Sequence, residues 1–376
     1  MYEGLRRHGW QATEPCTAAP STPAARFVPE GARSPRGSPI LPGVRFLAVA
    51  LASTLAVSVA LRIASGAAAP QWSREGLILV SLSGDSSVVM VSSETGATVA
   101  TFPVSLGPHE IVTSINRRFA FVANAGSGPG GMPGRSVSLL DLSDRKTQRT
   151  FDLGAIYEKP HDVRISRNNA ILWIACAPAR AVLEIDVKTG NVLKAWTTKA
   201  DGGWFVEVTP DGKKLYVPHL EGKSVSAISR TTGAVKTVVD GGAMSGIDVR
   251  PDGREVWVIA HEQKRVQIIS TATDKVVGSV ELPAADFGRL TFTPDGRQVL
   301  LIQGNRVALI NVAKRQHVAT IDLPSAGKVI SVSPRGDFLA VSHPSDNRLS
   351  VIDVAARKVA RSFPVGPVPD GVMWVR

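Results

Sequence analysis

Histidine is the residue of this sequence with the widest capacity for chemistry, because a neutral imidazole accepts protons near neutral pH and binds metal ions or haem iron. His109 and His161 each follow a proline and precede a carboxylate, Glu110 or Asp162. An imidazole beside a carboxylate suits general acid–base or metal-assisted chemistry. The other candidates are polar residues spread over the rest of the chain: Asn124, Cys176, His219, His261, His343 and Asp370.

The common catalytic motifs are absent from the sequence. It contains no Gly-x-Ser-x-Gly nucleophile elbow, no His-Glu-x-x-His zinc motif and no Cys-x-x-Cys-His for covalent haem attachment. The candidate residues are also far apart in the chain, so only the fold can bring them together.

One turn motif recurs along the chain at intervals of 52, 43, 41, 43 and 40 residues. Its copies are SINRRFAFV (114–122), SRNNAILWI (166–174), TPDGKKLYV (209–217), RPDGREVWV (250–258), TPDGRQVLL (293–301) and SPRGDFLAV (333–341). Self-similarity at such a period is typical of repeat architectures.

A second motif follows each turn, with alternating apolar and polar residues and many β-branched types: RSVSLLDL, RAVLEIDV, KSVSAISR, KRVQIIST, NRVALINV and NRLSVIDV. This alternation predicts a strand. The Asp-Gly, Asn-Asn and Arg-Gly pairs in the turns predict tight hairpins. With the strands before the turn and after the second motif, each repeat has four antiparallel strands, which is typical of a β-propeller.

The two ends of the repeat region complement each other. GLILVSLSGDSSVVMVSSETGATVATF matches strands two to four of a repeat, and the C-terminal PVPDGVMWVR matches the missing first strand. Residues 72–376 therefore predict an all-β, seven-bladed propeller of four-stranded antiparallel blades. The N- and C-terminal strands would share one blade, which leaves no open sheet edge.

The turn motifs, each followed by Val/Ile-x-Asn/His and an SVS-x-Ile-Asp segment, resemble the YVTN-type β-propeller repeat family, which is related to the cytochrome d1 haem propellers. The resemblance extends over 72–376, and Tyr216-Val217-Pro218-His219 is the segment nearest to the literal Tyr-Val-Thr-Asn string. It implies the propeller fold. It implies no single activity, because the family includes binding modules, haem d1 carriers or assembly factors, lactonase-like enzymes and surface proteins.

The repeat assigns a position to each candidate. The start of a first strand and the end of a second strand lie on one face of a propeller. His109, His161 and Asp370 start first strands, whereas the other histidines of this face, His219, His261 and His343, end second strands. Of the histidines after residue 72, only His317 is expected elsewhere.

Two-residue turns would also fix the residues that oppose one another across each hairpin. This register pairs His109 with Asn124, His161 with Cys176, and Trp204 with His219. His161 and Cys176 would then both reach one metal or haem iron, with His109 as a further ligand. A β-bulge would shift the pairing by one residue.

Every candidate also has a structural interpretation. His109 and His161 suit the turn between blades, and a polar residue at the end of a second strand suits a hydrogen bond to the following backbone. Cys176 suits a small buried core position. Trp173, Tyr216 and Trp257 recur at one second-strand position and are expected to pack between blades.

The N-terminal region predicts export. Residues 1–43, rich in Pro, Ala, Ser and Arg, predict a disordered leader or an extension ahead of a true start at Val44. Residues 44–69 combine a basic flank, an apolar run and an Ala-rich exit, so they predict a signal peptide, with an uncleaved N-terminal anchor as the alternative. After this region Cys176 is the only cysteine, so no internal disulfide is expected.

The sequence therefore predicts an exported, periplasmic or extracellular binding or scaffold protein that holds a small-molecule or protein ligand on its histidine-rich face. The alternatives are a haem d1- or metal-binding propeller and a lactonase-type hydrolase. The formal net charge is +11, and the Lys and Arg residues of 72–376 are spread over every repeat, which disfavours nucleic acid as the partner.

Overall fold

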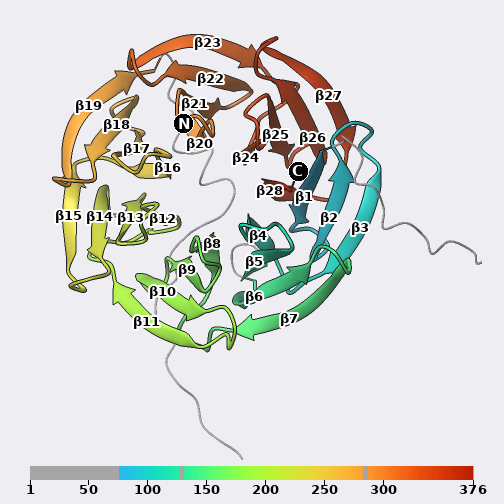
Figure 1. Cartoon of the computed structure of the whole chain (residues 1–376), viewed down its shortest axis with the longest axis horizontal. Helices are drawn as coiled ribbons and strands as arrows, with labels where there is room; N and C mark the ends of the chain where they lie inside the picture. The colour runs from blue at the N-terminus through green and yellow to red at the C-terminus, as the bar shows by residue number, and fades with distance from the viewer. Residues whose placement is uncertain (1–75, 128–130, 283–286, 376) are drawn as a thin grey trace, which may run out of the picture. The chain divides into compact units, whose positions relative to one another are not determined.

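Seven four-stranded antiparallel sheets stand as blades around one axis (Figure 1). The computed structural model describes residues 76–127, 131–282 and 287–375. The predicted leader, the start at Val44 and the signal peptide lie outside these residues. Within the described ranges, no helix has the length and apolar character needed to cross a membrane. The predicted all-β, seven-bladed propeller is confirmed.

The blades follow one another along the chain. Blade 1 contains β28 (Pro369–Trp374), β1 (Leu77–Leu82), β2 (Ser87–Ser92) and β3 (Thr98–Pro103). Blade 2 contains β4 (Pro108–Thr113), β5 (Phe119–Gly126), β6 (Pro133–Asp141) and β7 (Lys146–Asp152). Blade 3 contains β8 (Pro160–Ile165), β9 (Ile171–Cys176), β10 (Ala181–Asp186) and β11 (Val192–Thr197). Blade 4 contains β12 (Glu207–Val208), β13 (Lys214–His219), β14 (Ser224–Ser229) and β15 (Val235–Asp240).

The remaining blades have the same order. Blade 5 contains β16 (Met244–Val249), β17 (Glu255–Ala260), β18 (Arg265–Ser270) and β19 (Lys275–Glu281). Blade 6 contains β20 (Phe287–Phe292), β21 (Gln298–Gln303), β22 (Arg306–Asn311) and β23 (Gln316–Asp322). Blade 7 contains β24 (Ile330–Val332), β25 (Phe338–His343), β26 (Arg348–Asp353) and β27 (Lys358–Pro364). The first strand of each list lies nearest the axis (Figure 1).

Blade 1 closes the ring with strands from both ends of the repeat region. The C-terminal β28 pairs with β1 antiparallel, with Ile78 opposite Trp374 and Leu79 opposite Met373. This pairing confirms the predicted shared blade, and it covers the inner edge of β1 that would otherwise be open.

Side-chain hydroxyls set the repeated turn. Thr209 Oγ1 donates to Asp211 Oδ1 at 2.6 Å and accepts the backbone N–H of Lys214 at 3.1 Å. Gly212 follows with a φ of 69°, a left-handed conformation that glycine adopts without strain. Thr293 makes the same two bonds in blade 6. The Thr-Pro-Asp-Gly motif thus forms its turn through interactions among neighbouring residues.

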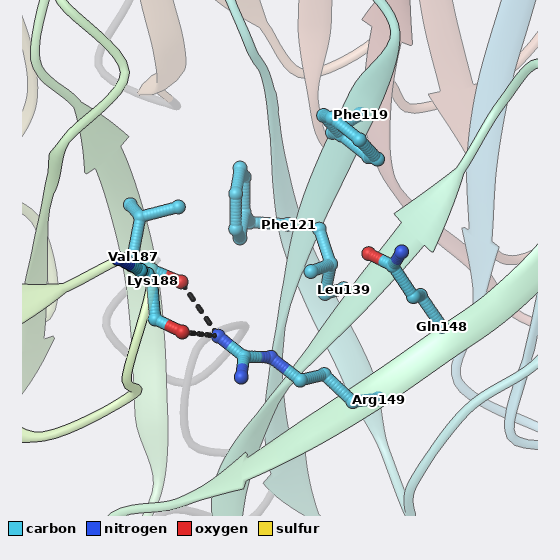
Figure 2. Close-up of a pocket in the computed structure, with 7 residues that line it drawn as sticks. All are labelled: Phe119, Phe121, Leu139, Gln148, Arg149, Val187 and Lys188. Carbon is cyan, nitrogen blue, oxygen red and sulfur yellow. Dashed lines mark hydrogen bonds between the residues drawn. The ribbon is translucent and has the colours of Figure 1, made fainter.

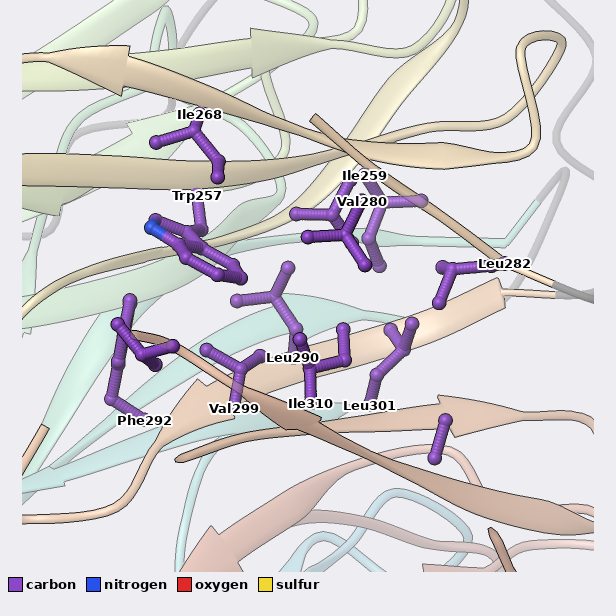
Figure 3. Packing of buried hydrophobic residues seen from close by; sticks show 13 residues of the cluster. Trp257, Ile259, Ile268, Val280, Leu282, Leu290, Phe292, Val299, Leu301 and Ile310 are labelled. Carbon is purple, nitrogen blue, oxygen red and sulfur yellow. The ribbon is translucent and has the colours of Figure 1, made fainter. Parts of the chain in front are cut away.

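Apolar side chains fill the space between neighbouring blades. Trp257 of blade 5 lies T-shaped against Phe292 of blade 6, with 5.6 Å between ring centroids. Isoleucine, leucine and valine side chains of both blades surround this pair (Figure 3). Trp173 and Tyr216, at the equivalent second-strand position, are 1% and 0% exposed. Their expected packing role is confirmed, and each large apolar side chain buried in this way contributes about 1.5–3 kcal/mol.

A recurrent β-bulge near the axis changes the predicted register. In blade 3 the predicted pairing holds from Ile165 to Asp162, then shifts so that Pro160, not His161, opposes Cys176. In blade 2 Pro108, not His109, opposes Asn124. Both predicted pairings are therefore wrong by one residue, and the same first strand shifts in blades 1, 5 and 6. A bulge turns its extra residue away from the ladder, here toward the axis.

In blade 4 the first strand forms no ladder pairs where blades 1, 2, 3, 5 and 6 have their bulge. Its first strand pairs only at Glu207 and Val208. Gly203 is the residue beside His219, since a Cβ on it would lie 3.3 Å from the imidazole Cε1. The predicted pairing of Trp204 with His219 is therefore not formed.

Candidate functional site

Nine residues from the first strands, or from the loops that lead into them, meet around the axis. They come from six of the seven blades and occupy two adjacent positions of the repeat. We call them the axial cluster: His109, Glu110, His161, Asp162, Trp204, Phe205, Arg289, Lys328 and Asp370. Five of them, His109, Glu110, His161, Asp162 and Asp370, are predicted site residues that the fold brings together.

One part of the axial cluster is an arc of contacts through blades 7, 1, 2, 3 and 4. Lys328 Nζ donates to Asp370 Oδ2 at 2.8 Å, and His109 Nδ1 lies 2.9 Å from the same oxygen. The His109 and His161 rings lie 4.6 Å apart between centroids, and Trp204 lies 5.6 Å beyond His161. Burial alone would raise the pKa of Asp370, but His109 and Lys328 hold it well below its usual range. Asp370 therefore stays ionised.

His161 occupies the middle of the arc. Burial, and then the neighbouring His109, lower its pKa well below the usual value, so the imidazole is neutral at pH 7. Its ring also meets Phe205 edge-on at 5.1 Å between centroids. Among the residues that the structure describes, the buried Nδ1 of His161 has no hydrogen-bond partner. A buried polar atom of this kind requires an explanation, because most have a partner in native proteins.

Arg289 reaches across the axis to three other blades. It starts from blade 6, yet its Nη2 lies 3.3 Å from Glu110 in blade 2 and 3.8 Å from Asp162 in blade 3. Its guanidinium carbon lies 4.3 Å from the centroid of the Phe205 ring in blade 4. Burial raises the pKa of Glu110, and Arg289 opposes that rise.

Glycines at the equivalent position of other blades keep the first strands close. A Cβ on Gly371 would lie 2.1 Å from the His109 carbonyl oxygen, and one on Gly246 would lie 2.6 Å from the Gly288 carbonyl oxygen. Neither approach is compatible with a larger residue, so the inner strands β28 and β16 depend on these glycines to reach their neighbours.

The carbonyl groups freed by the bulges are satisfied from neighbouring blades. Ser81 Oγ donates to the His109 carbonyl oxygen at 2.7 Å, and Ser342 Oγ donates to the Asp370 carbonyl oxygen at 2.7 Å. Each serine lies on the second strand of the blade before. The bulges are thus fixed by hydrogen bonds between blades.

A second group of polar side chains lies two residues further along the first strands. Arg164 pairs with both Asp162 and Glu207, and Asp162 also accepts the backbone N–H groups of Val163 and Val206 at 3.0 Å each. Burial lowers the pKa of an arginine, but Asp162 and Glu207 hold that of Arg164 well above its usual value. Burial raises the pKa of Glu207 to about 7 against the opposing effect of Arg164.

Three other predicted site residues are bonded within their own blades. Both His219 and His343 are 0% exposed, and their Nε2 atoms are hydrogen-bonded at 2.9 Å to Ser226 and Ser350. Asn124 is equally buried and donates to Ser136 and Ser138. These partners are serine side chains of the next strand, and among the described residues the expected hydrogen bond to the following backbone is found only for Asn124, which donates to the Ser136 carbonyl oxygen at 3.3 Å.

The last two predicted site residues, His261 and Cys176, differ from each other in their surroundings. His261 Nε2 is hydrogen-bonded to Ser245, which occupies the His109 position in blade 5. Cys176 lies in the apolar cluster between blades 2 and 3, and burial raises the pKa of its thiol to about 12. A protonated, fully buried thiol does not fit the predicted metal- or haem-ligand role. Among the described residues, no group of three or more His, Cys, Asp or Glu side chains has an arrangement that could hold a metal ion.

A shallow groove between blades 2 and 3 lies outside the axial cluster. Arg149 bridges it by donating from Nη2 to the carbonyl oxygens of Val187 and Lys188, at 2.7 and 2.6 Å (Figure 2). Phe119, Phe121, Leu139 and Gln148 complete its lining. With its arginine already bonded to backbone, the groove shows none of the chemistry of the axial cluster.

Sequence reasoning missed Arg289 and Lys328, although the repeat contains a signal for both. Lys328 lies five residues before Ser333, as His109 lies five residues before Ser114. Arg289 lies four residues before Thr293, as Glu110 lies four residues before Ser114. A comparison of all residue types at these two repeat positions, in place of the histidines alone, would have found them.

No protein-family model matches the chain, and no curated protein matches it. Solved structures share its fold. The hydrazine synthase of Kuenenia stuttgartiensis matches with a TM-score of 0.61 and 20% identity, over 72% of this chain and 90% of that one. The dihydro-haem d1 dehydrogenase NirN matches with a TM-score of 0.57 and 15% identity, over 77% of this chain and 64% of that one.

A functionally unknown protein from Desulfotomaculum acetoxidans matches with a TM-score of 0.68 and 11% identity, over 79% of this chain and 98% of that one. Identities this low establish the propeller fold alone. The resemblance to the YVTN-type repeat family is not confirmed by a family model.

Proposed function

We propose that this chain is an exported, YVTN-type propeller that binds a ligand at the axial cluster. The observation that carries the proposal is His161, a neutral imidazole with a buried Nδ1 that no described residue satisfies. It lies within ring contact of His109, Trp204 and Phe205. A bound molecule that accepts from or donates to His161 would supply the missing partner.

The exposure of the axial cluster supports binding from solvent. The side chains of Lys328 and His109 are 45% and 12% exposed, and His161, Trp204 and Phe205 are also partly exposed. The buried Asp370 bonds to Lys328 and His109, and Arg289 packs on the Phe205 ring, so both fix the side chains of the cluster in place. A rigid scaffold that presents a few polar groups beside aromatic rings is typical of a ligand site.

Imidazole NMR tests this proposal. Aromatic fragments of neutral, anionic and cationic type are added to the isotope-labelled protein, and the ring ¹H–¹⁵N signals of all histidines are followed. We expect ligands to shift His109 and His161, and not His317 on the outer strand β23. The proposal fails if no fragment moves His109 or His161 more than His317.

A second candidate ligand is a haem-type tetrapyrrole, because one fold neighbour is named for haem d1. A neutral imidazole such as that of His161 would suit haem iron, whereas the buried, protonated thiol of Cys176 would not. Haemin added to the apoprotein should then produce a shifted Soret band that is lost in His161→Ala and retained in Cys176→Ala. An unchanged Soret spectrum removes this candidate.

Export rests on the N-terminal sequence. The proposal predicts that residues 44–69 direct secretion of a passenger protein and that the mature chain begins near Ala68. N-terminal peptide mass spectrometry of the secreted protein checks the site. A passenger that stays in the cytoplasm, or a mature chain that retains residues 1–40, contradicts it.

A further inference from the structure

The carboxylates of the axial cluster already have partners. Asp370 has Lys328 and His109, at 2.8 and 2.9 Å. Asp162 accepts two backbone N–H groups and pairs with Arg164. Glu110 has Arg289. Each of these carboxylates is at most 6% exposed at its side chain, so little acceptor capacity faces a ligand.

The cationic donors, by contrast, have capacity left. The Lys328 ammonium has three N–H groups, one bond of which goes to Asp370, and its side chain is 45% exposed. Arg289 faces Glu110 and Asp162 through Nη2, while its buried Nη1 has no hydrogen-bond partner among the described residues. What remains for a ligand is therefore donation from cations, which favours an anion.

Aromatic rings lie between these two donors. His161 touches Trp204 and Phe205, and Phe205 lies against the Arg289 guanidinium. Lys328 bonds to Asp370, Asp370 lies against His109, and the His109 ring in turn contacts the His161 ring. A flat ring in a ligand would contact His161 and Trp204 face or edge, in the geometry that aromatic pairs prefer.

We infer that the axial cluster binds a flat aromatic carboxylate, whose anionic group is held by the exposed Lys328 ammonium while its ring packs on His161 and Trp204. The inference rests on the proposed function and adds to it the charge and shape of the ligand. It makes Lys328 the residue that selects an anion over a neutral molecule of the same shape.

Three matched probes test the inference: 2-naphthoate, its neutral isostere 2-naphthamide and the cation 2-naphthylmethylamine. Affinity is measured by calorimetry and location by the imidazole signals of His109 and His161. We expect 2-naphthoate to bind about tenfold more tightly than 2-naphthamide, the effect of one charge-assisted hydrogen bond. Equal affinities, or tighter binding of the cation, overturn the inference and leave the proposed function standing if His161 still shifts.

The variant Lys328→Gln separates charge from shape. It should weaken 2-naphthoate binding about tenfold and change 2-naphthamide binding less than twofold, because only the carboxylate uses the ammonium. Lys275→Gln, on the exposed outer strand β19, is the matched control and should change neither. If Lys328→Gln weakens both naphthalene ligands equally, the inference is wrong. If none of the three probes shifts His109 or His161, the inference and the proposed function both fall.

Discussion

Two pairs of histidines on the same face of this propeller show opposite relations to their surroundings. His219 and His343 end second strands, are 0% exposed and bond to a serine of their own blade. His109 and His161 sit in bulges of first strands, remain partly exposed and contact residues of other blades. A shared face therefore does not mean a shared role. What separates the pairs is whether the histidine's own blade supplies its hydrogen-bond partner.

The largest effect on stability is expected at Arg289, the residue that ties the bulge region together across the axis. Arg289→Leu leaves Glu110 and Asp162 buried without their cross-axis cation, which should cost about 3 kcal/mol in the free energy of unfolding. Chemical denaturation checks this value. Arg297→Leu, at a turn tip where the side chain is 85% exposed, is the control and should change stability by less than about 0.5 kcal/mol. Equal effects of the two variants would show that the contacts of Arg289 with Glu110 and Asp162 do not stabilise the fold.

The next effect is expected at the fully buried histidines. His343→Ala removes a buried ring and its hydrogen bond to Ser350, which keeps only Ser362 as a partner, so the unfolding free energy should fall by about 2–3 kcal/mol. Ligand binding at the axial cluster should be unchanged. His317→Ala on the outer strand is the control for denaturation. A stable His343→Ala protein that has lost binding would reverse the roles that we assign to the two pairs.

The second group of polar side chains should make stability depend on pH. Glu207 has a folded-state pKa of about 7, raised first by burial, whereas an unfolded glutamate titrates near about 4.3. Between these values the folded protein holds a proton that the unfolded chain has lost, so this contribution to stability falls as pH rises from about 4.3 to 7, by up to about 1.4 kcal/mol per pH unit. Denaturation at a series of pH values checks the slope.

Glu207→Gln should reduce that slope, and the part that remains belongs to other buried carboxylates whose pKa is raised, such as Glu110. Glu281→Gln, whose side chain is 71% exposed, should leave it as in the parent protein. A slope in Glu207→Gln as steep as in the parent protein would assign it to another group.

The smallest effect on stability is expected at His161. His161→Phe keeps an aromatic ring between Trp204 and Phe205 and removes a nitrogen that has no partner among the described residues, so the unfolding free energy should change by less than about 0.5 kcal/mol. Binding of aromatic ligands, followed by the His109 imidazole signal, should weaken. A variant that is strongly destabilised would place His161 with the structural histidines and contradict the comparison.

Much of the fold followed from local sequence. The Thr-Pro-Asp-Gly turns close through a threonine hydroxyl and a glycine with positive φ. Because these interactions are local, the repeat can be recognised from the sequence without tertiary contacts. The sharing of blade 1 followed from the incomplete repeats at the two ends. The hairpin register was also correct up to Asp162, because the turn fixes it residue by residue.

The candidate site followed only in part. The repeat phase placed His109, His161 and Asp370 at equivalent starts of first strands, and they do meet. The pairing of His161 with Cys176 failed because a bulge of one residue far from the turn leaves no local signal. Arg289 was missed because its partners belong to blades on the other side of the axis.

The sequence by itself determined the seven blades, their closure and the face on which the histidines gather, because turns and alternating strands are properties of short segments. Only the tertiary structure decided which histidines bond within their own blade and which meet side chains of other blades, since the latter depends on contacts between residues far apart in the chain. His343 bonds to Ser350 seven residues away, whereas the rings around His161 come from two other blades, blade 2 and blade 4. The environment of His161 at the axis, where its Nδ1 has no hydrogen-bond partner among the described residues, therefore depends on the closed ring and not on any single repeat.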